Sequence, residues 1–473
     1  MLSLLPFVLL AGADPAPPAS DHPNVIVVLA DDMGYGDPRC YQAASRVPTP
    51  AIDRLAAEGM RLTDMHTPSA VCSPTRYGLL TGRYAWRSSL KSGVLWGHSP
   101  MLIEPERETL GDLFQRAGYR TAAVGKWHLG LGDTDPADYG AVLSPSPLDL
   151  GFDRFFGIPA SLDIPPYLFL EGDRAVQELD GRVEASGQAR NGGGGFWREG
   201  EVSLDFQHDQ VLGRILSEGQ AFITKHEAEH ADQPFFLYLP LTAPHTPWLP
   251  LPPFQGATEA GPYGDFAAQV DDTMGQLLAT LDELELAEDT LVIFTSDNGA
   301  HWTPGDRDKY DHRANGPWRG QKADIHEGGH RVPFVLRWPG QIPAGEVRHE
   351  LLVHTDLYAT FAGLLGQPVP DGAAEDSFDA HDLWLGADLE EPPRTSAVHH
   401  SLNGHFAYRA GRWKLIESQG SGGFTRIDVA EDAPEGQLYD LRLDPAETTN
   451  LWDKKPEVVT RLRAELAAVR GDD

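Results

Sequence analysis

The segment "NVIVVLADD", residues 24–32, decides the fold class of this chain. Its first seven residues, Asn24 to Ala30, form a continuous apolar run rich in β-branched side chains. A strand that is covered on one face alternates apolar and polar residues, whereas a strand buried on both faces is apolar throughout. The run therefore predicts a central strand of a parallel sheet, with two aspartates at its carboxyl end.

Helix-like and strand-like segments alternate along the chain after this strand. Residues 49–59 predict a helix with Thr49 as N-cap, Pro50 as first helical residue and Gly59 at its end. The same reasoning predicts strands at 121–125, 234–241 and 290–296 and helices at 109–118 and 263–286. Strands that alternate with helices indicate an α/β fold, with a large, mostly parallel mixed sheet flanked by helices.

Composition divides the chain into three parts. Residues 1–20 predict a signal peptide and linker, residues 21–370 the α/β domain, and residues 371–473 a smaller α+β domain. In the last part, "HFAYRAGRWKLIES" predicts a hairpin that turns at Ala410 and Gly411, and "PEVVTRLRAELAAVRG" predicts a terminal helix. The glycine-rich residues 184–200 have no period, which predicts a mobile surface loop.

The charge and the N-terminus restrict partners and location. The net charge is −32 at pH 7, which argues against nucleic acid or an anionic membrane as a partner. An anionic substrate would therefore need a locally positive site. The apolar run Leu2–Leu10, followed by small residues, predicts an exported protein, periplasmic or secreted. No later segment is apolar and long enough to span a membrane.

Polar and ionisable residues follow four of the predicted strands. Because sites in α/β sheets form outside the carboxyl ends of the strands, we expect these residues to meet at one edge. Ordinary turn chemistry is the alternative explanation for each of them taken singly. The oxygen-bearing set favours a hard cation such as calcium or magnesium over zinc. The residues are Asp31 and Asp32, Lys126 and His128, His245, and Asp297 and Asn298.

The segment "CSPTR", residues 72–76, indicates an anion site beside a sulfur atom. Ser73 fits an N-cap and Pro74 a first helical residue, so Cys72 would lie at a helix N-terminus with Arg76 one turn on. Three interpretations of Cys72 remain open at this point: a thiolate nucleophile of low pKa, a buried small hydrophobe, or a disulfide with Cys40. A soft thiolate is a poor neighbour for a hard cation.

These motifs together resemble those of the type I sulfatases. "CSPTR" with "YGLLTGR" resembles the C-x-P-x-R signature, and "GKWHLG", "APHTPW", "TSDNG" and "GQKADIHEGGHRVP" resemble further family motifs in the same order. The resemblance, closest to arylsulfatase A and N-acetylgalactosamine-6-sulfatase, runs from about Asn24 to Leu451. It implies an alkaline-phosphatase-like fold and the hydrolysis of sulfate esters.

The resemblance also implies a cofactor set and residue roles. Cys72 would be oxidised to formylglycine by a maturation enzyme, and the hydrated aldehyde would supply oxygen atoms to one calcium ion, rather than magnesium. The implied metal ligands are Asp31, Asp32, Cys72, Asp297 and Asn298. The implied catalytic residues are Cys72, Arg76, Lys126, His128, His245, Asp297 and Lys322.

The substrate is predicted more coarsely, as a sulfated carbohydrate or an aryl sulfate. Arg87, Lys91 and His98, with nearby tryptophans, could line a sugar site or could serve only in packing. The stretch "RYAWRSSLKSGVL" resembles bacterial sulfatases acting on galactose or N-acetylgalactosamine 6-sulfates. Two alternatives remain: a phosphomonoester or phosphonate hydrolase of the same superfamily, and a non-catalytic calcium-dependent glycan-binding protein.

Overall fold

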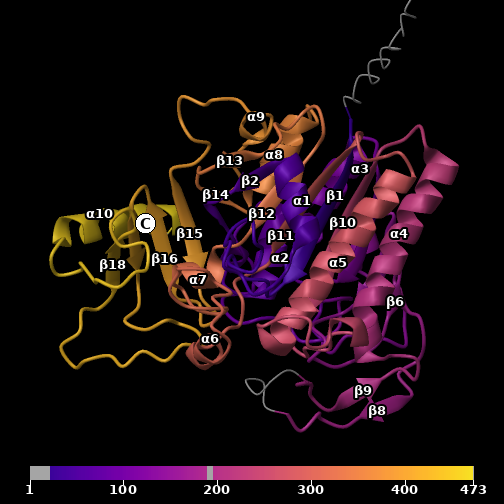
Figure 1. The fold of residues 1–473 in the computed structure, drawn as a ribbon, viewed down its shortest axis with the longest axis horizontal. Coiled ribbons are helices and arrows are strands. Elements are labelled where there is room, and N and C mark those ends of the chain that lie inside the picture. The colour runs from indigo at the N-terminus through magenta and orange to yellow at the C-terminus, as the bar shows by residue number, and fades with distance from the viewer. Residues whose placement is uncertain (1–21, 189–194, 472–473) are drawn as a thin grey trace, which may run out of the picture.

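The computed structural model of the protein describes residues 22–188 and 195–471. The predicted signal peptide lies outside the described residues, and so do residues 189–194 of the glycine-rich segment. Figure 1 shows a central sheet flanked by helices and, beside it, a smaller sheet that carries the C-terminal helix.

The central sheet has ten strands, with β1 (Asn24–Asp31) near its middle. Its order is β13-β2-β12-β11-β1-β10-β4-β5-β6-β7. Strands β11, β1, β10, β4 and β5 are parallel neighbours, whereas β12 and β6 run against the rest. The predicted large, mostly parallel mixed sheet is confirmed. The other strands are β2 (Met60–Leu62), β4 (Arg120–Lys126), β5 (Arg154–Ile158), β6 (Leu170–Glu171), β7 (Arg174–Ala175), β10 (Phe235–Pro244), β11 (Thr290–Ser296), β12 (Phe334–Arg337) and β13 (Glu346–Arg348).

Both faces of β1 are buried, as its apolar sequence predicts. Val25, Val27 and Leu29 pack into a cluster with α2 (Cys72–Thr81), α3 (Leu110–Arg116) and α8 (Asp356–Leu364). The alternate residues Ile26, Val28 and Ala30 pack on the other face with α1 (Pro50–Glu58), α4 (Val211–His230) and α5 (Gly261–Glu283). Figure 1 shows α4 and α5 side by side on that face. Two apolar layers therefore hold the sheet, and its polar residues collect at the strand ends.

Most predicted helix ends are close to those observed, but the predicted start of α2 is wrong by two positions. Thr49 is the N-cap of α1 and Gly59 its C-cap, and Thr109 forms a capping box with Asp112 at the start of α3. Helix α2 begins at Cys72, with Val71 rather than Ser73 as N-cap. The Ser73 hydroxyl instead accepts a hydrogen bond from the Leu95 backbone N–H at 3.1 Å. The Ser73 hydroxyl, which was expected to cap the helix, is therefore used in a contact with a residue distant in sequence.

The smaller C-terminal sheet is antiparallel and has the order β15-β16-β17-β18. The predicted hairpin is present, because β16 ends at Ala410 and Gly411 has a φ of 54° in the turn. Helix α10 (Pro456–Arg470) packs its Leu462 and Leu466 into a cluster with this sheet. The smaller α+β unit is thus confirmed, and its boundary after residue 370 stays a prediction. The strands are β15 (Ser396–His400), β16 (Phe406–Ala410), β17 (Trp413–Ile416) and β18 (Gln437–Asp440).

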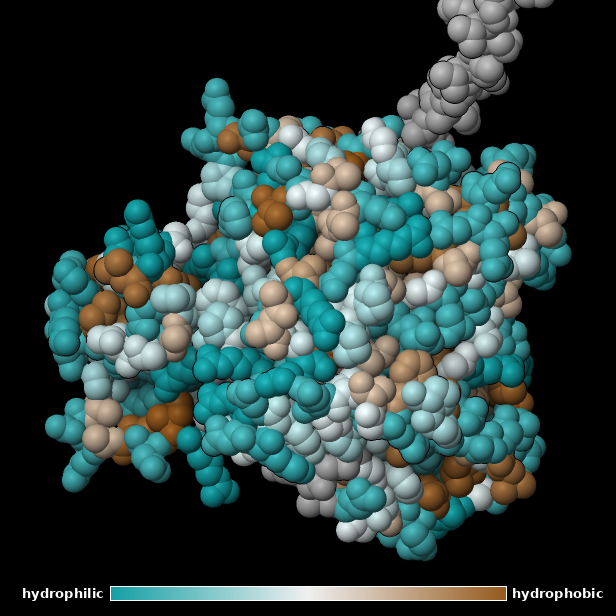
Figure 2. Space-filling view, in the orientation of Figure 1, coloured by the Kyte–Doolittle hydropathy of each residue, from teal (hydrophilic) through white to brown (hydrophobic). Residues whose placement is uncertain are grey.

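Short elements complete the described chain. They are β3 (Met65–His66), β8 (Gly181–Val183), β9 (Gly200–Val202), β14 (Leu352–Val353), α6 (Pro304–Tyr310), α7 (Glu327–His330), α9 (His381–Trp384), η1 (Ala85–Arg87), η2 (Pro147–Leu150), η3 (His208–Gln210) and η4 (Pro252–Phe254). Within the described ranges, no helix has the length and apolarity to cross a membrane. Hydrophilic residues cover much of the face seen in Figure 2.

A buried ionic network joins the C-terminal sheet to α7. The Lys414 ammonium, on β17, lies 3.0 Å from Glu327 Oε1 on α7 and 2.9 Å from Glu447 Oε1. It also contacts His330 Nε2 at 3.0 Å, and the Glu327 backbone N–H donates to Glu447 Oε2 at 2.7 Å. All four side chains are fully buried. This lysine is therefore shared by two carboxylates, and Arg331 Nη1 supplies a second cation to Glu327 Oε2 at 3.2 Å.

Lys414→Met should lower the free energy of unfolding by about 3–5 kcal/mol, because it leaves Glu447 buried without its counter-charge and Glu327 with Arg331 alone. Urea denaturation measures this change, with the exposed Lys455→Met as the matched control. A loss below about 1 kcal/mol, the size expected of a surface ion pair, would contradict the assignment.

Candidate active site

Four neighbouring parallel strands deliver the predicted site residues to one edge of the central sheet. Strands β11, β1, β10 and β4 lie side by side in that order. Each ends at a polar segment, and the carboxyl ends of parallel strands share one edge. Asp31 ends β1 and Lys126 ends β4, while His245 follows β10 and Asp297 follows β11.

Three carboxylates come together there, supported by backbone and amide donors. The Asp32 backbone N–H donates to Asp297 Oδ1 at 3.1 Å, and Asn298 Nδ2 donates to Asp32 Oδ1 at 2.7 Å. Asp32 has a φ of 66°, in the left-handed region that is uncommon for residues other than glycine. Such strained backbone persists where the surroundings hold it, and it concentrates at functional sites.

Three cationic side chains face the three carboxylates. Lys126 Nζ donates to Asp31 Oδ2 at 2.7 Å, and Lys322 Nζ donates to Asp32 Oδ1 at 2.6 Å. Arg76 donates from Nε and Nη2 to Asp297 Oδ2, at 3.1 and 2.7 Å. All six side chains are buried. The cluster is therefore formally neutral before any cation or substrate enters.

The pKa values of the two adjacent aspartates move apart. Burial alone would raise the pKa of Asp31, but Lys126, Arg76 and Lys322 together lower it below its usual value. Burial, together with the charges of Asp31 and Asp297, raises the pKa of Asp32 to about 6, although Lys322 opposes the rise. Like charges held this close favour a bound cation, which relieves their repulsion.

Cys72 lies at the centre of this cluster. Its Sγ is 3.7 Å from Asp31 Oδ1 and 3.5 Å from Lys322 Nζ. Burial raises the pKa of the thiol to about 12, although Lys126 and Lys322 oppose the rise. The side chain is thus a neutral thiol, which disfavours a thiolate nucleophile of low pKa. Cys40 and Cys72 are both free, so the alternative disulfide is not formed.

The donor set fits a hard cation. Asn298 Oδ1 is buried and has no hydrogen-bond partner among the described residues, so an oxygen acceptor is available beside the carboxylates. One ligand atom from each of Asp31, Asp32, Cys72 and His245 lies within 4.8 Å of the others. A carboxylate-rich set with an amide oxygen suits calcium or magnesium. Asp31, Asp32, Asp297 and Asn298 are the residues that could hold such an ion.

The two predicted histidines have different surroundings. His128 Nε2 lies 2.9 Å from the Leu95 carbonyl, while its buried Nδ1 has no hydrogen-bond partner among the described residues. Burial, with Lys126 and Arg76, keeps the pKa of His128 well below its usual value. A neutral ring that donates from Nε2 leaves Nδ1 able to accept a proton.

His245 points its Nε2 atom toward Asp32 and its Nδ1 atom toward a backbone carbonyl. Its Nε2 is 3.7 Å from Asp32 Oδ2, and its Nδ1 is 2.6 Å from the Thr246 carbonyl. Nδ1 also lies 3.9 Å from Asp163 Oδ1. A ring that donates from Nδ1 to a carbonyl and has a carboxylate nearby is suited to carry a positive charge.

The comparisons with known proteins decide the family. A family model described as "Sulfatase" matches residues 23–367, and one described as "N-sulphoglucosamine sulphohydrolase, C-terminal" matches residues 320–472. The chain belongs to the sulfatase family. The resemblance predicted from the motifs is therefore confirmed.

Individual sulfatases match along nearly the whole chain. The N-acetylgalactosamine-6-O-sulfatase of Bacteroides thetaiotaomicron is 35% identical over 95% of this chain and 94% of its own length. Arylsulfatase A of Homo sapiens is 34% identical over 93% of this chain and 86% of its own. A solved sulfatase structure, titled for glycosaminoglycan metabolism by Bacteroides thetaiotaomicron, superposes with a TM-score of 0.85 at 34% identity, covering 96% of this chain and 100% of that one.

This sulfatase is accordingly a sulfuric ester hydrolase. The non-catalytic alternative is not supported by these relatives.

The sulfatase site includes a residue that sequence reasoning missed. Asp163 is 1% exposed, and its Oδ1, which faces His245, has no hydrogen-bond partner among the described residues. Its Oδ2 accepts from Arg198 Nη1 at 2.7 Å. Asp163 follows β5, the parallel strand next to β4. The rule that found the other strand-end residues would have found it, had "RFFGI" been identified as a strand.

The predicted substrate-binding residues of the sulfatase do not lie together. Arg87 and Lys91 line one cavity. His98 lines a different cavity and lies 3.3 Å from Glu201 Oε2. The three residues are close in sequence, but the irregular chain between them turns away from the first cavity.

Proposed function

We propose that this exported sulfatase removes the 6-sulfate of N-acetylgalactosamine or galactose residues, using formylglycine at position 72 and one calcium ion. The observation that carries the proposal is the position of residue 72, which touches both an Asp31 carboxylate and the Lys322 ammonium. An oxygen nucleophile there would face cation ligands and sulfate-binding cations together. The 6-sulfate assignment is supported by the name of the Bacteroides relative. A maturation enzyme would supply the oxidation of Cys72.

The first half of the reaction would depend on positive charge and a general acid. The hydrated aldehyde at position 72 would supply two hydroxyl groups. A calcium ion held by Asp31, Asp32, Asp297 and Asn298 would lower the pKa of a nearby hydroxyl and offset sulfate charge. Asp297 would take the proton of the attacking hydroxyl, while Arg76 holds that carboxylate. Lys126 and Lys322 would bind the sulfate oxygens. His245, assisted by Lys322, would protonate the leaving alcohol from Nε2.

The second half would depend on His128. Its unpartnered Nδ1 would accept the proton of the remaining hydroxyl at position 72. The carbonyl then reforms as the bond to sulfate breaks, which releases sulfate and restores the aldehyde. A thiol has no second hydroxyl, so an unmodified Cys72 could not complete this step.

Cys72→Ala should lower kcat for an aryl sulfate by at least about 10³-fold, because it removes the nucleophile. The midpoint of thermal unfolding should stay near that of the parent, since alanine fits the buried position. Mass spectrometry of the active parent should find an aldehyde at position 72. Equal activity in a preparation that keeps the thiol would contradict the assignment, and a phosphate ester assayed in parallel separates this function from a phosphatase.

Removal of divalent cations should abolish activity, and calcium should restore it better than magnesium, because the donors are carboxylate and amide oxygens. Calcium should also raise the thermal midpoint of the metal-free protein, since only the folded state assembles the ligands. Asn298→Ala should need more calcium for the same shift. Full activity in protein shown by elemental analysis to be metal-free would refute the cation assignment.

Asp163→Asn should lower kcat for a sugar sulfate by about 10-fold, because the carboxylate stabilises His245 in its protonated form. An aryl sulfate with a good leaving group needs less protonation, so its kcat should fall much less. Steady-state kinetics on both esters measures the difference. Equal losses on the two substrates would indicate a structural role for Asp163 instead.

A further inference from the structure

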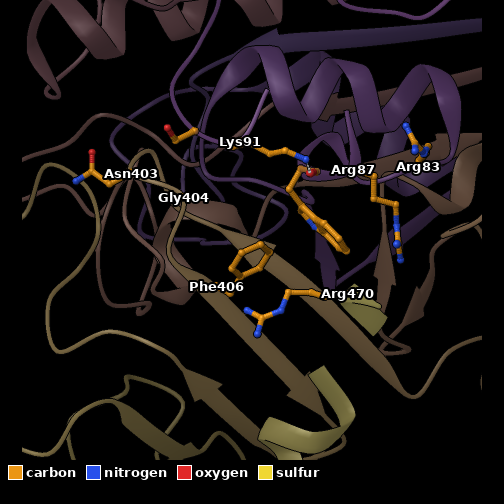
Figure 3. Close-up of a pocket in the computed structure, with 9 residues that line it drawn as sticks. Arg83, Arg87, Lys91, Asn403, Gly404, Phe406 and Arg470 are labelled. Carbon is orange, nitrogen blue, oxygen red and sulfur yellow. Dashed lines mark hydrogen bonds between the residues drawn. The ribbon is translucent and has the colours of Figure 1, made fainter. Parts of the chain in front are cut away.

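A basic cavity of about 800 Å³ lies between the segment after α2 and the C-terminal unit. Figure 3 shows its lining residues, with Asn403 and Gly404 at one end, Arg83 at the other, and Phe406 and Arg470 between them. Four of the lining residues are cationic and none is acidic: Arg83, Arg87, Lys91 and Arg470. In a chain whose net charge is −32, such a lining marks a place for an anion.

Lys91 supplies the uncompensated charge of the basic cavity. Arg87 pairs with Asp376 at 2.9 Å and Arg83 with Glu104 at 3.1 Å, and neither acid belongs to the lining. Lys91 Nζ instead donates to the Trp86 carbonyl at 2.6 Å, and no carboxylate in the described part of the chain pairs with it. Its remaining hydrogens can therefore meet a bound oxyanion.

Two aromatic rings, Trp86 and Phe406, form part of the wall of the basic cavity. Trp86 and Phe406 meet edge to face at 5.5 Å, and the guanidinium groups of Arg87 and Arg470 lie over these rings at 4.4 and 4.9 Å. Trp86 is 7% exposed, and its Nε1 has no hydrogen-bond partner among residues 22–188 and 195–471. A buried indole N–H normally finds an acceptor, so this donor is an unsatisfied polar atom in the wall of the cavity.

Two hydrogen-bonded chain segments connect the basic cavity with the active site. Ser92 lines the cavity, and three residues later the Leu95 carbonyl contacts His128. On the opposite wall, Gly404 follows Leu402, whose backbone N–H donates to the Ala323 carbonyl beside Lys322. The Gly93 N–H joins the two segments by donating to the Leu402 carbonyl at 2.7 Å. Three extended residues span at most about 11 Å, so Ser92 of the cavity lies within that distance of Leu95, the residue that contacts His128.

We infer that the basic cavity binds an oxyanion on the sugar that neighbours the sulfated residue. The oxyanion is a carboxylate or a second sulfate, and Lys91 is its main contact. This inference rests on the proposed function, because it takes the sulfated residue to be one unit of a longer saccharide. The enzyme would then favour acidic oligosaccharides over isolated sulfated sugars.

The test compares 6-sulfated N-acetylgalactosamine joined to glucuronate, to a sulfated neutral sugar, or to an uncharged sugar. The parent enzyme should show a higher kcat/KM on one or both anionic substrates than on the neutral one, and which of them it favours identifies the oxyanion. This ratio should fall about tenfold in Lys91→Ala, the effect of losing one charge-assisted hydrogen bond. Lys225→Ala, an exposed lysine on α4, should keep the parent ratio. Added salt should lower the ratio in the parent.

A binding measurement separates this inference from the 6-sulfate assignment. Calorimetric titration with the desulfated disaccharides should show tighter binding of the glucuronate or sulfated-neighbour compound than of the neutral one, even if 6-sulfates prove not to be substrates. Lys91→Gln, which keeps most of the side chain, should lose this preference. A parent enzyme that does not distinguish charged from neutral neighbours in either assay, or a Lys91 variant that keeps the distinction, would overturn the inference.

Discussion

The active site depends on the compensation of three buried carboxylates by three buried cations. An isolated charge buried away from water costs several kcal/mol, so none of these groups is tolerated without its partner. The partners come from separate parts of the chain: β1 pairs with the end of β4, α2 with the segment after β11, and the turn after β1 with the segment ahead of α7. The residue pairs are Asp31 with Lys126, Asp297 with Arg76, and Asp32 with Lys322. The site therefore forms only when these segments have assembled around the central sheet.

This pairing also explains how an acidic protein can attract an anion. The cluster is neutral by itself, so a divalent cation makes it positive at the point where a sulfate would bind. The acidic surface has limited effect there, because salt screens exposed charges beyond about 10 Å. Lys91 is a second source of local positive charge, because no carboxylate in the described part of the chain pairs with it and no acidic residue lines its cavity.

Much of the fold could be predicted, because continuous apolar runs identify the buried strands of the parallel sheet. Much of the candidate site could be predicted too, because its polar residues follow directly after these strands. What failed depended on contacts between distant segments. Ser73 is a good N-cap by local chemistry, yet its hydroxyl binds the Leu95 backbone. Asp163 was missed because β5 is short and is bounded by irregular chain. His98 lies apart from Arg87 and Lys91 because the loop path, which no periodicity encodes, decides which cavity each residue faces.

The burial of Cys72 limits when this side chain can be modified relative to folding. The thiol is 2% exposed and every residue of α2 is buried, so a second enzyme cannot reach this side chain in the folded protein. On the proposed function, conversion of the thiol has to precede closure of the sheet. An unconverted chain would still fold, because a neutral thiol fits the position without an unpaired charge. The same burial that holds residue 72 among the carboxylates and lysines would thus fix an unconverted molecule in an inactive state.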